Sequence, residues 1–317
     1  MKRVVTIGGG TGSFVLLSGL KKYPLEISAI VSMADDGGST GLLRDELGVL
    51  PPGDVRKCLA ALAQASPEVR DLFNYRFTNG KLEGHNAGNL FISALEKVTG
   101  SFTKAVEVAG KILNIYGKVI PVTEEDMRLV VELNNGVSLQ GESKLDDNKE
   151  VRENGVRGVS LNHEVEANED ALTAISEADL IVIGPGDIYG SIVPNLLVNG
   201  ISESLKKTKA KIIVVANITN KKGLTDGFTV QDFAKFIEGY MLGRTVDMVI
   251  YNTQVPEEDL VLKYEEQEGQ DMIVEYDTKS EIPVMGVDLL VDEEKHFIRH
   301  DSDKLATAVV EYMKDNE

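Results

Sequence analysis

Two glycine-rich segments of this chain have a composition that suits phosphate binding through backbone N–H groups. Residues 8–13 read Gly-Gly-Gly-Thr-Gly-Ser and follow the β-branched stretch 4–7, whereas residues 184–191 read Gly-Pro-Gly-Asp-Ile-Tyr-Gly-Ser and follow the nearly all-aliphatic stretch 179–183. A glycine turn between a buried strand and a helix brings N–H groups close to a phosphate at the N-terminus of the helix. The predicted ligand-binding residues of these segments are Gly9, Gly10, Thr11, Gly12, Ser13, Gly184 and Gly186. Residues 10–12 and 184–186 are predicted to contact the phosphates through backbone N–H groups.

The first segment resembles a dinucleotide-binding fingerprint, with Gly8 and Gly10 as the first two glycines and Ser13 in place of a third small residue. No Lys follows these glycines, so the segment is not a Walker A loop. The alternative is a tight turn between a strand and a helix that binds nothing. We favour the phosphate site because two such segments follow separate strands of one expected sheet.

An acidic loop follows the second expected strand, residues 25–33. Residues 34–41 read Ala-Asp-Asp-Gly-Gly-Ser-Thr-Gly, and ligands bind at this end of a strand in open α/β sheets. We predict that Asp36 lies near the phosphates or the ribose, where its carboxylate accepts a hydrogen bond from a hydroxyl group or holds Mg²⁺. Asp36 is therefore the candidate metal ligand. The alternative is a solvated turn.

Amide and hydroxyl side chains follow two further expected strands. Asn217 and Thr219 come after the strand expected at 211–216, and Asn252 comes after the strand expected at 246–250. Parallel strands end at the same edge of a sheet, so we predict that these side chains line the ligand site.

Two asparagines and one arginine complete the predicted ligand contacts. Asn86 and Asn89 precede the helix expected at 91–98, which either can cap, and both are candidates for hydrogen bonds to the ligand. Arg299 follows the last apolar stretch, and a guanidinium group can donate two parallel hydrogen bonds to a phosphate. The alternative for Arg299 is a surface position before a helix capped by Asp301 or Ser302.

Strands and helices alternate along most of the chain. This order predicts a single Rossmann-like α/β domain over residues 1–317, with a largely parallel sheet flanked by helices. Residues 118–161, approximately, form a β-rich insertion of short strands separated by turns. Asn135-Gly136 between two such strands is a strong hairpin signal.

The composition limits which binding partners and which cellular location we expect for this protein. The net charge is −18, from 51 acidic and 33 basic residues, which argues against a nucleic-acid partner because nucleic acids need clustered Lys and Arg. No stretch approaches the ~20 apolar residues of a transmembrane helix, and the N-terminus enters a strand without a signal peptide. Cys58, the only cysteine, is expected to be a small buried residue. We therefore expect a cytoplasmic protein.

Taken together, segments 8–13, 35–41, 52–59, 84–90 and 184–197 resemble the CofD-like superfamily, and within it the YvcK branch of bacterial gluconeogenesis factor proteins. The resemblance implies a Rossmann-like fold and a nucleotide-type ligand. For the YvcK branch it implies a cytoplasmic protein that binds UDP-sugars such as UDP-N-acetylglucosamine (UDP-GlcNAc) and links carbon metabolism to cell-wall synthesis and cell shape.

The CofD branch is similar in fold but transfers a 2-phospholactyl group from a nucleotide-linked donor to a deazaflavin acceptor, with Mg²⁺. Asp36 looks like a counterpart of that branch's acidic metal-site residues. After Leu43, however, this chain reads Arg-Asp-Glu-Leu-Gly and then Pro-Gly-Asp-Val-Arg from Pro52, where that branch carries Ser-Pro-Asp-Leu-Asp. This departure favours a ligand-binding regulator over a transferase.

Three functions follow from these observations. The first is a nucleotide-sugar sensor that acts on regulatory protein partners, and the second is a Mg²⁺-dependent 2-phospho-L-lactate transferase. The third, an NAD-dependent oxidoreductase, is disfavoured because a nicotinamide site needs neither a second glycine loop nor an acidic loop. For an enzyme, the candidate general bases are Asp36, Asp54 and His300. The sequence leaves open whether the chain forms a homo-oligomer.

Overall fold

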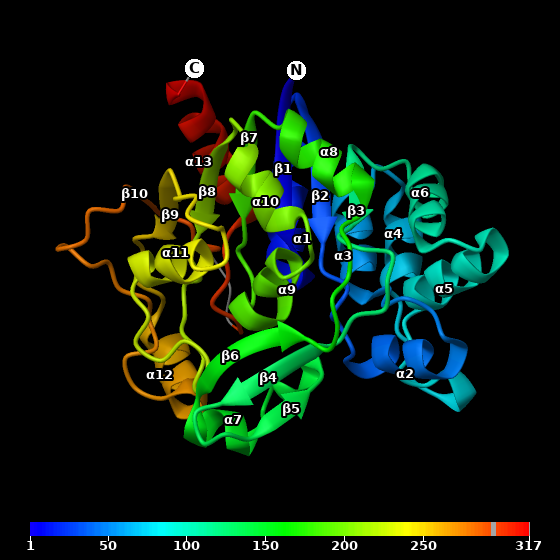
Figure 1. The fold of residues 1–317 in the computed structure, drawn as a ribbon, viewed down its shortest axis with the longest axis horizontal. Helices are drawn as coiled ribbons and strands as arrows, with labels where there is room; N and C mark the ends of the chain where they lie inside the picture. The colour runs from blue at the N-terminus through cyan, green and yellow to red at the C-terminus, as the bar shows by residue number, and fades with distance from the viewer. Residues whose placement is uncertain (293–295, 317) are drawn as a thin grey trace.

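The computed structural model describes residues 1–292 and 296–316 and contains a seven-stranded sheet in which every pairing is parallel. The order across the sheet is β10-β9-β8-β7-β1-β2-β3 (Figure 1). The strands are β1 (Lys2–Gly8), β2 (Leu25–Val31), β3 (Lys118–Pro121), β7 (Leu180–Ile183), β8 (Lys211–Val215), β9 (Met248–Asn252) and β10 (Val284–Val287). The predicted α/β class with a parallel sheet is confirmed.

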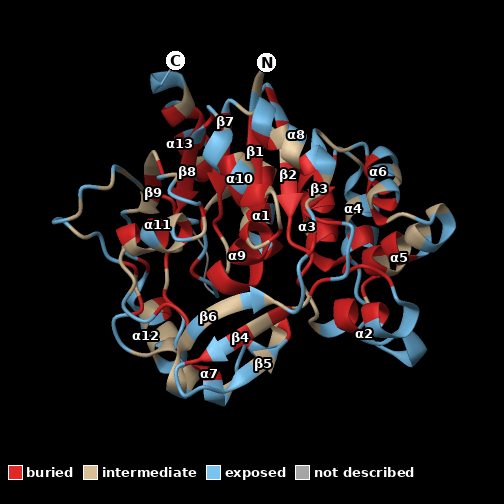
Figure 2. Ribbon diagram, viewed as in Figure 1, coloured by how far each residue is buried: buried red, intermediate tan, exposed pale blue. Residues whose placement is uncertain are grey.

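The central strands are aliphatic because helices cover both faces of the sheet. All four residues of β7 are buried, and so are the last five of β1. Strands buried on both faces read as continuous runs of Val, Ile and Leu rather than as alternating patterns. In Figure 2 the centre of the sheet and the helices α1 and α3 are largely red, which marks buried residues.

Helices connect the parallel strands and lie on the two faces of the sheet. Figure 1 shows α8 and α10 in front of the sheet and α1 and α13 behind it, where α1 packs against α3 and α13. The α-helices are α1 (Gly10–Leu20), α2 (Gly38–Leu47), α3 (Gly53–Leu62), α4 (Pro67–Asn74), α5 (Ala87–Thr99), α6 (Phe102–Ile112), α7 (Lys149–Asn154), α8 (Glu169–Glu177), α9 (Val193–Leu196), α10 (Ile201–Lys207), α11 (Val230–Glu238), α12 (Glu258–Glu268) and α13 (Ser302–Asp315), and a π-helical turn spans Ile188–Ile192. Within the described residues, no helix combines the length and the apolar character that crossing a membrane requires.

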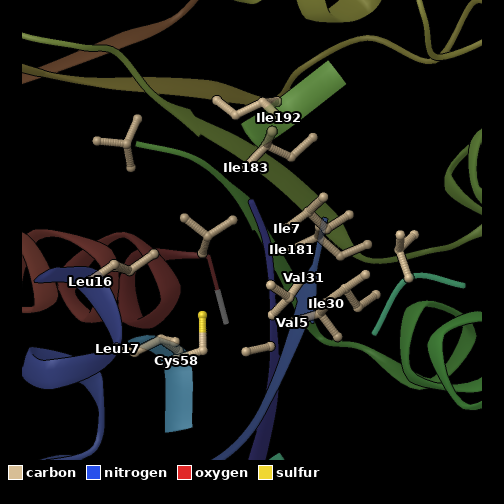
Figure 3. Close-up of a cluster of buried hydrophobic side chains, with 14 of the residues drawn as sticks. Val5, Ile7, Leu16, Leu17, Ile30, Val31, Cys58, Ile181, Ile183 and Ile192 are labelled. Atoms are coloured by element: carbon tan, nitrogen blue, oxygen red, sulfur yellow. The ribbon is translucent and has the colours of Figure 1, made fainter. Parts of the chain in front are cut away.

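The core beside β1 explains the role of the single cysteine. Figure 3 shows Leu16 and Leu17 of α1 close to Cys58 of α3, on one side of the strand that carries Val5. Cys58 is fully buried, and burial raises the pKa of its thiol far above the ordinary value. The prediction of a small buried residue is confirmed.

A separate three-stranded antiparallel sheet lies beyond the carboxyl ends of the parallel strands, opposite the two chain termini (Figure 1). Its strands are β4 (Leu129–Leu133), β5 (Ser138–Gln140) and β6 (Val156–Leu161), with β4 in the middle. The Asn135-Gly136 hairpin is present, since β4 pairs antiparallel with β5. The β-rich segment predicted at about 118–161 is thus divided, because β3 pairs parallel with β2 at the edge of the main sheet.

Some local predictions differ from the structure. Helices α2, α6 and α7 were not predicted. Helix α2 begins within the acidic loop at Gly38, α6 follows α5 after two residues, and α7 lies within the segment expected to be β-rich. The order Pro51-Pro52-Gly53-Asp54 predicts Asp54 as the cap of the helix that follows, but in the structure Pro52 is the N-cap residue and Asp54 lies in the first turn of α3. That difference matters because it leaves the Asp54 carboxylate available for another contact.

Candidate ligand-binding site

The two glycine-rich segments meet at the point where the strand order of the sheet reverses. The chain passes from β1 to β2 on one side of β1, whereas β7 pairs with β1 on the other side. In open α/β sheets, the crevice at such a reversal is where ligands bind. The contact between the segments is close, because a Cβ on Gly12 would overlap the Pro185 carbonyl and lie 3.0 Å from the Cα of Gly186.

The first glycine segment forms the start of α1. Gly9 is the N-cap residue in an extended conformation, and Gly10 has a φ of +66°, which favours glycine. The first N–H groups of a helix have no carbonyl partner within it, and the helix dipole favours a negative charge there. A Cβ on Gly9 would overlap the Asp54 carboxylate, so glycine at this position also makes room for that side chain.

The second glycine segment is held in place by side chains from neighbouring strands and turns. Gly186 N donates to Asn217 Oδ1 at 3.2 Å, and Asn217 Nδ2 donates back to Gly186 O at 2.9 Å. Asp187 Oδ1 accepts from the N–H groups of Tyr189 and Gly190, at 3.1 and 2.8 Å. The backbone of this loop is therefore fixed before any ligand binds.

Two pockets adjoin at the glycine segments. The smaller pocket has a volume of about 190 Å³ and the larger pocket about 450 Å³. Both are lined by Thr11, Gly12, Gly186, Asp187 and Lys221. The smaller pocket extends toward the aliphatic side chains Val15, Ile188, Ile218 and Leu224, together with Thr219, Arg299 and His300. The larger pocket extends toward Asp35, Asp54, Lys57, Glu142 and Ser191.

Carboxylates dominate the larger pocket, and two of them have raised pKa values. Burial and the neighbouring Asp54 raise the pKa of Asp35 to about 6, although Gly37 N donates to Asp35 Oδ1 at 3.0 Å. Burial, followed by the charges of Asp35 and Asp187, raises the pKa of Glu142 to about 8. Negative charge is therefore only partly compensated on this side of the site.

Two lysines provide positive charge near the glycine segments. Lys57 Nζ lies 3.4 Å from Asp54 Oδ1, on the next turn of α3. Lys221 Nζ lies 3.0 Å from Asp187 Oδ2 and 3.1 Å from Asp146 Oδ1. Burial by itself would lower the pKa of Lys221, but the two carboxylates outweigh it and hold the pKa above the ordinary value. Lys221 therefore stays charged beside both pockets.

The donor atoms in the larger pocket suit Mg²⁺ in their chemistry. Mg²⁺ is usually bound through one or two carboxylates together with substrate phosphates and waters. Asp35 and Asp54 both line the larger pocket, together with the glycine segment Gly9–Gly12. No group of three or more His, Cys, Asp or Glu side chains is arranged to hold a metal ion in the part of the chain that the structure describes. Two carboxylates beside a phosphate site fit an ion that is shared with a ligand.

Eight of the predicted ligand contacts line the two pockets, namely Gly9, Gly10, Thr11, Gly12, Gly186, Asn217, Thr219 and Arg299. Gly184 and Ser13 lie beside the pockets without lining either one. Gly184 N donates to Ile7 O at 3.0 Å, and the Ser13 hydroxyl is buried against Gly8. The Arg299 guanidinium stacks on the Phe297 ring, 4.1 Å from its centroid.

The structure places the other four predicted contacts in structural hydrogen bonds outside the pockets. Asp36 Oδ1 accepts from Ser143 N at 2.8 Å, and Asn252 Oδ1 accepts from Gln254 N and Leu289 N at 3.2 and 3.1 Å. Asn86 caps α5, as was expected, by accepting from the N–H groups of Gly88 and Asn89. Asn89 Oδ1 accepts from Arg56 Nε at 2.9 Å.

Asp35, Glu142 and Lys221 line the larger pocket but were not among the predicted contacts. Asp35 adjoins Asp36 in the sequence. The two residues differ in the direction of their side chains, and the sequence does not show which one points into the pocket. Lys221 follows the end of β8 closely enough for strand-end reasoning to have included it. Glu142 gives no sequence signal, because the small sheet carries it over the pocket from a distant part of the chain.

The model of the family described as 2-phospho-L-lactate transferase CofD matches residues 4–294, which contain both glycine segments and every pocket residue except Ile298, Arg299 and His300. The chain belongs to the CofD family. It is 38% identical to the Gluconeogenesis factor of Bacillus subtilis, over 99% of this chain and 98% of that protein. It is 37% identical to the Gluconeogenesis factor of Halalkalibacterium halodurans, over 98% and 96%. These relatives confirm the YvcK branch of the CofD family that the motifs indicated.

A solved structure agrees with this assignment. The crystal structure of a protein member of the UPF0052 family from Bacillus halodurans matches with a TM-score of 0.91 and 35% sequence identity. The match covers 98% of this chain and 100% of that chain. The architecture described above is therefore shared along nearly the entire length of both chains.

Proposed function

We propose that this CofD-family chain binds a nucleotide sugar of the UDP-GlcNAc type in the cytoplasm and acts as a regulator rather than converting its ligand. Through protein partners it links carbon metabolism to cell-wall synthesis and cell shape. The relatives from Bacillus subtilis and Halalkalibacterium halodurans carry the name gluconeogenesis factor, which supports the connection with carbon metabolism.

The observation that carries the proposal is the position of the glycine segments between two different pockets. Gly12 and Gly186 lie in the shared wall together with Lys221. Backbone N–H groups at a helix N-terminus and a lysine suit a diphosphate. The larger pocket offers carboxylates and the Ser191 hydroxyl, which accept hydrogen bonds from sugar hydroxyl groups. A pocket on each side of the diphosphate matches a nucleoside on one side and a sugar on the other.

The test is a binding screen by thermal shift and calorimetry with UDP-GlcNAc, UDP-glucose, GDP, NAD and ATP. A ligand at 100 times its Kd stabilises a protein by about 2.7 kcal/mol, which is readily detected. We expect UDP-GlcNAc to stabilise the protein most, with NAD and ATP without effect. Binding of NAD alone would contradict the proposal. Recovery of intact UDP-GlcNAc after prolonged incubation distinguishes a regulator from an enzyme.

A second candidate function is Mg²⁺-dependent 2-phospho-L-lactate transfer, and the carboxylates of the larger pocket favour it. Asp35 and Asp54 would hold Mg²⁺ beside the phosphates, and the ion would supply positive charge that stabilises the leaving group. The chain is incubated with a nucleotide-linked phospholactyl donor, a deazaflavin acceptor and Mg²⁺, and the acceptor is examined by mass spectrometry. A Mg²⁺-dependent increase in acceptor mass would establish the transferase and displace the regulator proposal.

A further inference from the structure

One residue that lines the smaller pocket, His300, carries a buried ring nitrogen that no described residue uses. The Nε2 atom of His300 is buried without a hydrogen-bond partner in the part of the chain that the structure describes, and His300 lines the smaller pocket. A buried polar atom without a partner is destabilising, so most such atoms in proteins are satisfied by protein groups, ordered water or a bound ligand.

The protonation state of this imidazole follows from its other contact. The backbone of Ala216, the residue after β8, forms a hydrogen bond with the His300 ring that favours the protonated imidazole, so the Ala216 carbonyl is the acceptor and a ring N–H is the donor. Since Nε2 has no partner, Nδ1 is the donor. Burial nevertheless lowers the pKa of His300 to about 4, so the ring is neutral near pH 7 and Nε2 presents a lone pair.

The walls of the smaller pocket suit a flat, partly apolar group. Val15, Ile188, Ile218 and Leu224 supply aliphatic surface, and Gly12 and Gly186 join this pocket to the proposed diphosphate position. A nucleobase has two apolar faces and a polar edge. The pocket has apolar walls, and His300, which carries the unused acceptor, is one of its lining residues. The carboxylates of Asp35, Asp54 and Glu142 line the other pocket, which is better matched to a sugar.

We propose that the smaller pocket binds the nucleobase and that His300 Nε2 accepts a hydrogen bond from N3–H of a uracil ring. This inference rests on the proposed nucleotide-sugar function and adds the residue that recognises the base. His300 thereby determines specificity without taking part in any chemical step. A base whose N3 carries no hydrogen loses this bond and leaves the buried Nε2 unsatisfied.

The test compares UDP-GlcNAc with its N3-methyluridine analogue by calorimetry on the wild-type protein and on His300→Phe. Phe retains a buried ring but has no acceptor. We expect the wild type to bind the methylated analogue about tenfold more weakly, as the loss of one buried hydrogen bond predicts. The His300→Phe protein should bind both ligands with affinities within about twofold of each other, because a buried acceptor no longer distinguishes them.

The ligand comparison needs no variant, so it remains decisive if His300→Phe does not fold. Equal affinity of the wild type for the two ligands overturns the role of His300 and leaves the nucleotide-sugar function standing. No binding of UDP-GlcNAc to the wild type overturns both. As an independent readout, the ¹⁵N resonance of His300 Nε2 should shift on addition of UDP-GlcNAc, and an unchanged resonance in the complex would contradict the hydrogen bond.

Discussion

The backbone of Gly12 lies directly against the carbonyl group of Pro185, with no space for a side chain between them. This contact joins the first turn of α1 to the loop after β7, although Gly12 and Pro185 are 173 positions apart in the chain. Both loops reach the same edge because β1 and β7 are parallel neighbours, with Ile7 opposite Ile183. The proposed diphosphate position depends on this contact.

We predict that Gly12→Ala lowers both stability and ligand affinity. The new Cβ would overlap the Pro185 carbonyl, so one loop must move, and forcing extra atoms into a packed site typically costs about 1–3 kcal/mol. Chemical denaturation and calorimetry with UDP-GlcNAc measure the two effects. Gly158→Ala is the matched control, since a Cβ on Gly158 would meet no atom within 4 Å. Identical behaviour of the two variants would contradict the prediction.

We predict that Asp36→Ala weakens binding of UDP-GlcNAc by about fivefold, the effect of losing one hydrogen bond of about 1 kcal/mol. Asp36 Oδ1 accepts from Ser143 N at 2.8 Å, which holds the segment that carries Glu142 over the larger pocket. Asp45→Ala is the control, because Asp45 also joins α2 to the small sheet, through Arg128, but lines neither pocket.

The same variant tests whether Asp36 is a metal ligand. Affinities of wild type and Asp36→Ala are measured in Mg²⁺ and in EDTA. If Asp36 holds Mg²⁺, the loss in affinity should disappear in EDTA, because the ion is then absent from both proteins. A loss of equal size in both buffers would assign Asp36 to the Ser143 contact alone.

We predict that Arg299→Ala weakens UDP-GlcNAc binding by about tenfold, or about 1.4 kcal/mol. Arg299 lines the smaller pocket, and its guanidinium group lies on the ring of Phe297. The prediction is that this group donates hydrogen bonds to the phosphates of the bound ligand. Lys263→Ala is the control, because Lys263 Nζ also lies over the Phe297 ring, at 5.7 Å, but lines neither pocket. Calorimetry at two salt concentrations measures the effect, and wild-type affinity in Arg299→Ala would place this residue outside the ligand contacts.

We predict that Glu142 makes the protein less stable as the pH rises. The pKa of this carboxyl group is about 8 in the folded protein, against an ordinary value of 4.5. Between these two values the folded state retains a proton that the unfolded state has released, so the free energy of unfolding falls as the pH rises from about 4.5 to about 8. The dependence ends above the folded pKa, where both states are ionised.

Glu142→Gln should reduce this decline, because the amide side chain does not ionise. Urea denaturation of the ligand-free protein at intervals between pH 5 and about pH 8 gives the slope for each variant. Glu164→Gln, at an exposed position, serves as the control and should retain the wild-type slope. A Glu142→Gln protein with the wild-type slope would show that another group is responsible.

Patterns short enough to be read along the chain predicted much of the fold. The aliphatic run at 179–183 indicated a strand buried on both faces, and β7 is one. Asn135-Gly136 indicated a hairpin, and the glycine segment at 8–13 indicated a strand followed by a helix. These predictions succeed because hydrophobic periodicity and glycine conformation act over a few residues and need no distant partner.

The direction of individual side chains required the tertiary structure. Asp35 and Asp36 are equivalent in the sequence, yet Asp35 lines the larger pocket and Asp36 faces Ser143. Asn252 was predicted to follow a strand at 246–250 and is the last residue of β9. Its amide group does not line either pocket, because it bonds to Gln254 O and to the N–H of Leu289. Which residues a side chain contacts depends on how the helices and strands are oriented in space. The positions at which strands end in the sequence do not give that orientation.

The sequence alone thus determined that two glycine segments would follow buried strands and precede helices, and that asparagine and threonine side chains would follow β8. Only the tertiary structure decided that β1 and β7 are neighbours, that Glu142 reaches the larger pocket, and that His300 lines the smaller pocket with an unused acceptor. The physical reason is distance along the chain. Local backbone preferences are encoded within a few residues, whereas a binding site forms where segments far apart in sequence pack together.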